Sequence, residues 1–506
     1  MEASKRIFIN TIAQYTKAII NTCLSLYTVR LVLAALGQSD YGIFSLVAGI
    51  VAMLGFVINA MVITTQRFLS FNQGKNDVER LRKYFSNSFL LHIFIGIIIS
   101  VILLSFKDFL CNKFLNIADG RRTASDIIYT FTTLMLLFSF LSSPFKAALI
   151  AHENIVYISV IEVLDGIMKL VLAVSLLGLR SDKLVVYVII LMCISLFEML
   201  AFTFYSVSKY KECSPTKFKT DYDINIIKEL GGFAKWTTYG MGAVLLRTQG
   251  LSILINKFFG TILNASYGIA LQMFGAVSFV SSSLVNAMNP ILMRSEGQNN
   301  RDKTLSIAEQ ESKFIVAIMS VLFIPLIIEM DNILYLWLKD VPPLTPFLCR
   351  CFLVCFLIDQ TTYGLNSVNQ AMGNIRNYTI LMYTPKLLFL PIALLLLYIG
   401  YGIEIIMSLF IGVELIVALL RLPYIHHSAG LTISCYCRNV FLRLTPMIII
   451  MICISWAVHQ LELPLGFIWN FIISGSFGCA AAWICVLTKE ERNIICNIIS
   501  KRKEYA

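Results

Sequence analysis

The sequence predicts an all-α integral membrane protein of about fourteen transmembrane helices. Two six-helix lobes, related by a pseudo-two-fold axis along the membrane normal, are expected to be followed by two further helices. Three observations predict this fold. Of the 506 residues, 58% are hydrophobic and only 14% are charged, whereas a soluble domain carries about 25% charged residues. Apolar stretches of about 20 residues recur along the chain, and motifs of the first half reappear in the second.

Each apolar stretch is long enough to cross the roughly 30 Å hydrocarbon core of a bilayer. Helices are expected because lipid offers no hydrogen-bond partners to the backbone. The first stretch contains Asn10, Gln14 and Lys17, which an apolar signal sequence would lack, so it is interpreted as an uncleaved span. The expected spans are 7–36, 41–63, 85–106, 124–150, 155–178, 184–207, 231–256, 264–293, 308–329, 345–369, 378–399, 403–425, 437–458 and 466–487.

The net charge of +11 is explained mostly by topology. If both termini face the cytoplasm, the cytoplasmic side holds roughly three times as many Lys and Arg residues as the opposite side. The basic, amphipathic segment 65–84 is expected to lie along the inner membrane surface. The connections are too short for a soluble catalytic domain, so an enzyme is not expected.

An internal repeat divides the chain. Tyr41-Gly42-Ile43 matches Tyr267-Gly268-Ile269 at an offset of 226, and Asn59-Ala60-Met61 matches Asn286-Ala287-Met288 at 227. Transporters built from parallel repeats bind their substrates between the two halves. The expected organisation is an N-lobe at 1–207, a cytoplasmic linker at 208–230, a C-lobe at 231–425, and two helices with a basic cytoplasmic tail at 426–506.

Polar side chains form a stripe along the first span. Their steps of three and four residues place them on one helix face, and lipid would reject such a face. They either line a water-filled lumen or hydrogen-bond to neighbouring helices, and Lys17 and Asn21 are candidate substrate contacts. The stripe consists of Asn10, Gln14, Lys17, Asn21, Ser25 and Thr28.

Span 231–256 carries a similar polar face, with Gln249 on it and Lys235 at its edge. Arg247 points away from that face, and Arg30 lies near the outer end of the first span. Both arginines are candidates either for substrate contact or for anchoring at the outer interface or between the lobes.

Carboxylates within the spans are candidates for ion coupling or for internal neutralisation. Asp165 and Lys169 are spaced to pair on one helix, with Glu162 close by. Three acids of the second half have no partner evident from the sequence and are possible ion-coupling residues: Asp359, Glu404 and Glu414. The thirteen cysteines lack metal-ligand spacing, so neither a metal nor a cofactor is expected.

Three segments resemble a known family. YTVRLVLAALGQSDYGIFSLVAG at 27–49, TTQRFLSFNQGKNDVERLRKYFSNSF at 64–89 and SSPFKAALIAHENIVYISVIEVLDGIMKL at 142–170 resemble the polysaccharide-transport (Wzx-type) branch of the multidrug/oligosaccharidyl-lipid/polysaccharide (MOP) exporter superfamily. The resemblance implies a flippase in a bacterial inner membrane. Its substrate would be an undecaprenyl-diphosphate-linked oligosaccharide moved to the periplasmic leaflet for O-antigen, lipopolysaccharide, capsule or exopolysaccharide assembly, alongside other glycan assembly proteins.

The resemblance also implies that spans 1, 2, 7 and 8 line the cleft. These spans hold Lys17, Arg30, Lys235 and Arg247 but no Asp or Glu, which suits a diphosphate headgroup. Arg30 matches the first-helix arginine of the related peptidoglycan-precursor flippase. That flippase, a MATE-like cation or drug antiporter on the same fold, and a membrane glycan polymerase or ligase remain the alternatives.

Overall fold

The computed structural model describes residues 2–111, 119–178, 181–214, 221–338, 341–461 and 465–493. The expected basic tail lies outside these residues. By its contacts the described chain divides into two compact units. Unit 1 comprises 1–242 and 286–299, and unit 2 comprises 243–285 and 300–506. The lobe boundaries expected from the sequence stay a prediction.

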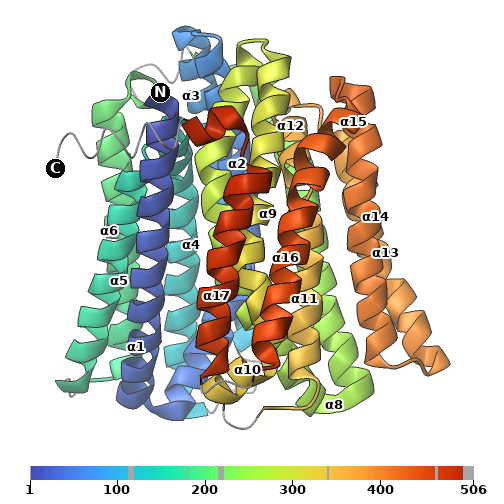
Figure 1. Cartoon of the computed structure of the whole chain (residues 1–506). Coiled ribbons are helices and arrows are strands. Elements are labelled where there is room, and N and C mark those ends of the chain that lie inside the picture. Colours follow the sequence, from blue (N-terminus) through green and yellow to red (C-terminus); the bar gives the residue numbers. More distant parts are fainter. Residues whose placement is uncertain are drawn as a thin grey trace, which may run out of the picture. The chain divides into compact units, whose positions relative to one another are not determined.

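Unit 1 is built from long helices that follow the expected spans (Figure 1). Its helices are α1 (Glu2–Ala52), α2 (Gly55–Gly74), α3 (Val78–Phe109), α4 (Arg122–Ala151), α5 (Ile155–Gly178), α6 (Lys183–Lys209) and the beginning and end of α8 (Ile224–Gly297).

Unit 2 contains the middle of α8 and all later helices. These are α9 (Arg301–Ile328), α10 (Met330–Leu338), α11 (Thr345–Gln360), α12 (Tyr363–Met372), α13 (Arg376–Ile399), α14 (Ile403–Ala429), α15 (Ile433–Tyr436), α16 (Leu442–His459) and α17 (Gly466–Ala481).

Helical segments therefore coincide with all fourteen expected spans, and the protein is a multi-pass membrane protein. Among the described residues, ten helices are long and apolar enough to cross a membrane, and the bent pair α11–α12 would make eleven. Helix α5 is not among the ten because Glu162, Asp165 and Lys169 interrupt its apolar sequence.

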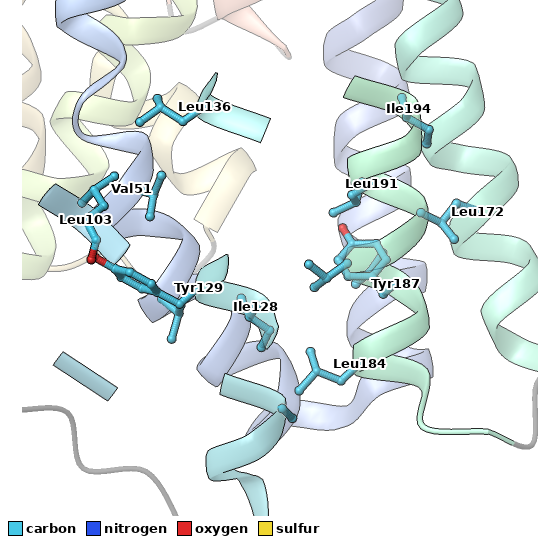
Figure 2. Close-up of a cluster of buried hydrophobic side chains, with 14 of the residues drawn as sticks. Val51, Leu103, Ile128, Tyr129, Leu136, Leu172, Leu184, Tyr187, Leu191 and Ile194 are labelled. Atoms are coloured by element: carbon cyan, nitrogen blue, oxygen red, sulfur yellow. The ribbon is translucent and has the colours of Figure 1, made fainter. Parts of the chain in front are cut away.

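An apolar core of unit 1 forms where helices α1 to α6 bring buried residues together (Figure 2). Tyr129 and Tyr187 are the largest members, and the Tyr129 hydroxyl donates to the Leu103 carbonyl at 3.0 Å. That bond satisfies a polar group that would otherwise be costly inside an apolar core.

The repeat is visible in the backbone. Helix α1 is broken at Gly37 (φ 78°) and α8 at Gly260 (φ 84°), a conformation that favours glycine. The same offset of 223 relates Gly74, the last residue of α2, to Gly297, the last residue of α8. The backbone offset differs from the sequence match at 226–227 by about one helical turn. A shift of one turn leaves side chains on the same helix face, so the backbone offset and the sequence offset place matching residues on equivalent faces of the two repeats.

The two repeat ends pack against each other within unit 1. A Cβ added to Gly74 would lie 2.1 Å from the Arg294 carbonyl oxygen, and one added to Gly297 would lie 2.0 Å from that of Phe71. Only glycine permits this approach. The expectation that 65–84 lies along the membrane surface is therefore wrong for its first half, which ends helix α2 with Arg67 buried beside Phe68 and Phe71.

Candidate functional site

A cluster of five ionisable side chains lies inside unit 2. Arg247 of α8 donates to Glu414 of α14 at 2.6 Å, and Lys386 of α13 lies 2.8 Å from the other Glu414 oxygen. Arg421 of α14 donates to Asp359 of α11 at 2.7 Å, and Lys386 lies 3.7 Å from the same Asp359 oxygen. We call these five residues the C-unit network.

The network is buried and carries an excess of positive charge. Arg247 is 5% exposed and Glu414 4%. Three cations face two carboxylates, so one positive charge remains uncompensated within the set. Ionisable groups at membrane depth are costly and are functional-site candidates by default.

Arg247 has more unsatisfied hydrogen-bonding capacity than its single ion pair can use. Its guanidinium carbon lies 4.0 Å above the Phe410 ring, a cation–π contact. Only one of its three side-chain nitrogens has an acceptor among the described residues, since Nε and Nη1 are buried without one. Arg247 therefore retains unused donors for a further acceptor.

A break in the tenth span positions the network. Helices α11 and α12 meet at a bend of 49°, which interrupts the backbone ladder at residues 361–362. Arg421 donates to the Asp359 carbonyl at 2.9 Å and contacts the Thr362 hydroxyl at 3.3 Å. Broken spans of this kind commonly build the substrate and ion sites of transporters.

A second charged cluster lies in unit 1. Lys17 of α1 donates to Glu162 of α5 at 2.7 Å, and Lys146 of α4 donates to the other Glu162 oxygen at 2.5 Å. Asn21 donates to the Glu162 carbonyl at 3.3 Å. The predicted pair on α5 is confirmed, with Lys169 and Asp165 2.7 Å apart.

The polar stripe of α1 therefore packs against its own unit at several points. Asn10 is buried and donates to the Glu153 carbonyl at 2.9 Å, while Lys17 and Asn21 contact α5. These contacts match the interhelical hydrogen-bonding interpretation of the stripe rather than a fully lumen-facing one.

The remaining candidates are exposed. Arg30 on α1 and Lys235 and Gln249 on α8 are exposed side chains. Lys235 lies 5.3 Å from the Trp236 ring, and neither cation has a carboxylate partner in the described part of the chain. Glu404 is exposed in the first turn of α14, away from the network.

The structure brings three of the predicted residues, Arg247, Asp359 and Glu414, into one site. It adds Lys386 and Arg421, which sequence reasoning did not select. Their spacing held a partial signal, since Arg421 lies two helical turns after Glu414 on one face of α14. Spans 1, 2, 7 and 8 contain no Asp or Glu in their sequences. Their cations Lys17 and Arg247 nevertheless pair with carboxylates of other helices, Glu162 of α5 and Glu414 of α14.

Comparisons with known proteins agree with this architecture. Residues 17–175 match the MatE family model. A MOP superfamily transporter from Pyrococcus furiosus, described as having a binding pocket of reverse polarity, superposes with a TM-score of 0.71 at 13% identity, covering 86% of this chain and 96% of that one. The chain has the MATE transporter fold.

Two further solved structures with the MATE fold support this. An outward-facing multidrug resistance MATE family transporter of the MOP superfamily gives a TM-score of 0.69 at 14% identity over 86% of this chain and 97% of that one. A MATE protein in the bent conformation gives a TM-score of 0.71 at 14% identity over 87% of this chain and 97% of that one. No curated protein matches the chain.

Proposed function

We propose that this protein is a flippase for an undecaprenyl-diphosphate-linked oligosaccharide. It would sit in a bacterial inner membrane with both termini in the cytoplasm. The single observation that carries the proposal is the excess of cations over carboxylates in the C-unit network. A diphosphate headgroup is an anion that Arg and Lys bind through charge-assisted hydrogen bonds.

The exposed cations add support. Arg30 and Lys235 are exposed, and neither side chain has a carboxylate partner among the described residues. Lys235, near the cytoplasmic end of span 231–256, would meet an entering anionic headgroup, and Arg30, near the outer end of the first span, would meet it before release. Lys17 and Arg247 would also bind the headgroup. As the helices move, each would exchange its glutamate partner, Glu162 or Glu414, for a phosphate oxygen.

In the proposed cycle the headgroup enters from the cytoplasmic side and the polyprenyl tail stays in lipid. The sugars occupy the polar surfaces near Asn21 and Gln249. Rearrangement of the two units then presents the headgroup to the periplasm, and no covalent bond is broken. Released substrate would pass to other glycan assembly proteins.

A MATE-like cation or drug antiporter is the second candidate. The MatE match and the MATE structures favour it more directly than they favour a flippase. Both carboxylates of the C-unit network argue against the antiporter, because Asp359 is paired with Arg421 and Glu414 is paired with Arg247 and Lys386, which leaves neither available to a transported cation. The Pyrococcus furiosus transporter is described as having a binding pocket of reverse polarity, which suggests a different function for it. This fold can therefore carry binding pockets of different polarity.

Deletion of the gene in its own cell separates the two candidates. A flippase predicts that lipid-linked oligosaccharide accumulates on the inner leaflet and that surface glycan is lost. Altered resistance to cationic drugs or dyes without glycan loss would favour the antiporter. Returning the gene as a Lys17→Ala and Arg247→Ala variant tests the charge mechanism, which would be wrong if export were fully restored.

A further inference from the structure

Glu311 of α9 is a buried carboxylate that the C-unit network does not use. It is 0% exposed. Its described contacts consist of one hydrogen bond, in which the Ser367 hydroxyl of α12 donates to Oε1 at 3.0 Å, while Oε2 is buried without a partner. No cation lies within ion-pair distance of it in the described part of the chain. An ionised carboxylate in such a place would be very unfavourable.

The surroundings of Glu311 tie it to the broken tenth span. The neighbouring Ser312 accepts a hydrogen bond from the Gly364 N–H at 2.9 Å, at the beginning of α12. A Cβ on Gly364 would lie 2.0 Å from the Ala308 carbonyl oxygen of α9. Helices α9 and α12 are therefore in backbone contact here, and any movement of α12 at the break changes the surroundings of Glu311.

The other titratable groups around α9 have partners elsewhere, are phenols or, like Arg438, are exposed. Glu309 accepts from Asn439, and Lys313 pairs with Glu491. Helix α17 contains no charged residue. The groups on the remaining packed elements are Tyr363 on α12, Tyr436 on α15, Arg438 after it, Arg443 and His459 on α16, Asp331 on α10, and Arg350 and Asp359 on α11.

We propose that Glu311 is a proton-binding site of this transporter, neutral in the structure described and able to release its proton when α12 moves away from α9. As the acid, Oε2 carries the proton and Oε1 accepts from Ser367, which leaves no buried charge. On release the proton passes to water and the carboxylate becomes charged. A metal ion fits less well because it requires several oxygen ligands, and no group of three His, Cys, Asp or Glu in the described residues could hold one.

Proton binding at Glu311 requires that the protein is a transporter but not that it carries a particular substrate. It can therefore be correct even if the proposed flippase function is wrong. Purified protein is titrated from acidic to alkaline pH while the infrared band of protonated carboxyl groups is followed. Wild type and Glu309→Gln, a control on the same helix, should show a band that is lost with rising pH. Glu311→Gln, which mimics the neutral acid in shape, should lack that component.

A second measurement needs no variant. A hydrophobic carbodiimide reacts with protonated buried carboxyl groups, and mass spectrometry locates the adduct. Labelling at Glu311 should fall about tenfold per pH unit above the titration midpoint. The proposal is overturned if Glu311→Gln leaves the infrared band unchanged, or if the Glu311 band or labelling is absent or does not vary with pH, since a purely structural acid would stay neutral throughout.

Discussion

Arg247 of α8 and Glu414 of α14, 167 residues apart, are joined by a 2.6 Å hydrogen bond between two buried side chains. This ion pair links the seventh and twelfth expected spans. Lys386 contacts the same carboxylate. Glu414 therefore balances two of the three buried cations of the C-unit network.

Replacing that glutamate should destabilise the protein strongly. Glu414→Gln leaves Arg247, Lys386 and Arg421 with only Asp359 to balance them, and an uncompensated buried charge costs about 3–5 kcal/mol. Thermal unfolding in detergent measures the loss. Glu404→Gln, on the exposed first turn of α14, should stay within about 0.5 kcal/mol of wild type. Equal midpoints for the two variants would show that the network does not stabilise the fold.

The close approach of α2 and α8 predicts opposite effects for two glycines of α8. Gly297→Ala places a Cβ against the Phe71 carbonyl oxygen, so a loss of about 1–3 kcal/mol is expected. Gly275 has no atom within 4 Å of its added Cβ, and Gly275→Ala should stabilise the helix by up to about 1 kcal/mol. Unfolding midpoints that move in the same direction would contradict this packing.

Arg294 should couple energetically to Glu153. The two lie 2.7 Å apart, and Arg294 also contacts Gln73 and the Ala151 carbonyl. Because Glu153 is 8% exposed, a double-mutant cycle to Ala should give a coupling energy of about 1–3 kcal/mol. The exposed pair Lys83–Glu79, cycled in parallel, should give only about 0.3–0.5 kcal/mol. A coupling no larger than this control would mean that the contact at Arg294 is not specific.

The Lys313–Glu491 pair predicts loss of stability in acid. Burial acts to raise the pKa of the Glu491 carboxyl, but hydrogen bonds from Lys313 and the Thr488 N–H outweigh it and hold the pKa below its ordinary value of 4.5. A depressed carboxyl pKa stabilises the fold above that value, and the contribution is lost as pH falls through and below it. The effect is on the order of 1 kcal/mol or less.

Unfolding midpoints of wild type and Glu491→Gln across acidic pH measure this contribution. The difference between the two proteins should be present at neutral pH and vanish in acid. A difference that stays constant with pH would rule out the ion pair as its cause.

Local sequence patterns predicted the helices, but they did not predict ion pairs between residues that are distant in the sequence. The i,i+4 pair Asp165–Lys169 is confirmed because helix geometry alone brings it together. The partners of Lys17 and Arg247 lie 145 and 167 residues away, so no spacing rule reveals them.

Two further features were invisible in the sequence for physical reasons. Glu311 follows the polar first turns of α9, so its complete burial depends on the packing of distant segments such as α12, which contacts it through Ser367. The approach of Gly74 to Arg294 depends on where two helices cross, which a residue pattern does not encode.

The central claim is that cations of this protein bind an anionic headgroup, and export by a variant that lacks Arg30 and Lys235 tests it most directly because their removal breaks no carboxylate pair in the described residues. In cells deleted for the gene, Arg30→Gln with Lys235→Gln is compared with wild type and with Lys257→Gln, which removes an exposed α8 lysine packed on Phe258 and Tyr398. All three proteins should be made in equal amounts. The account predicts that only the double variant accumulates lipid-linked oligosaccharide on the inner leaflet, and surface glycan at the wild-type level in that variant would contradict it.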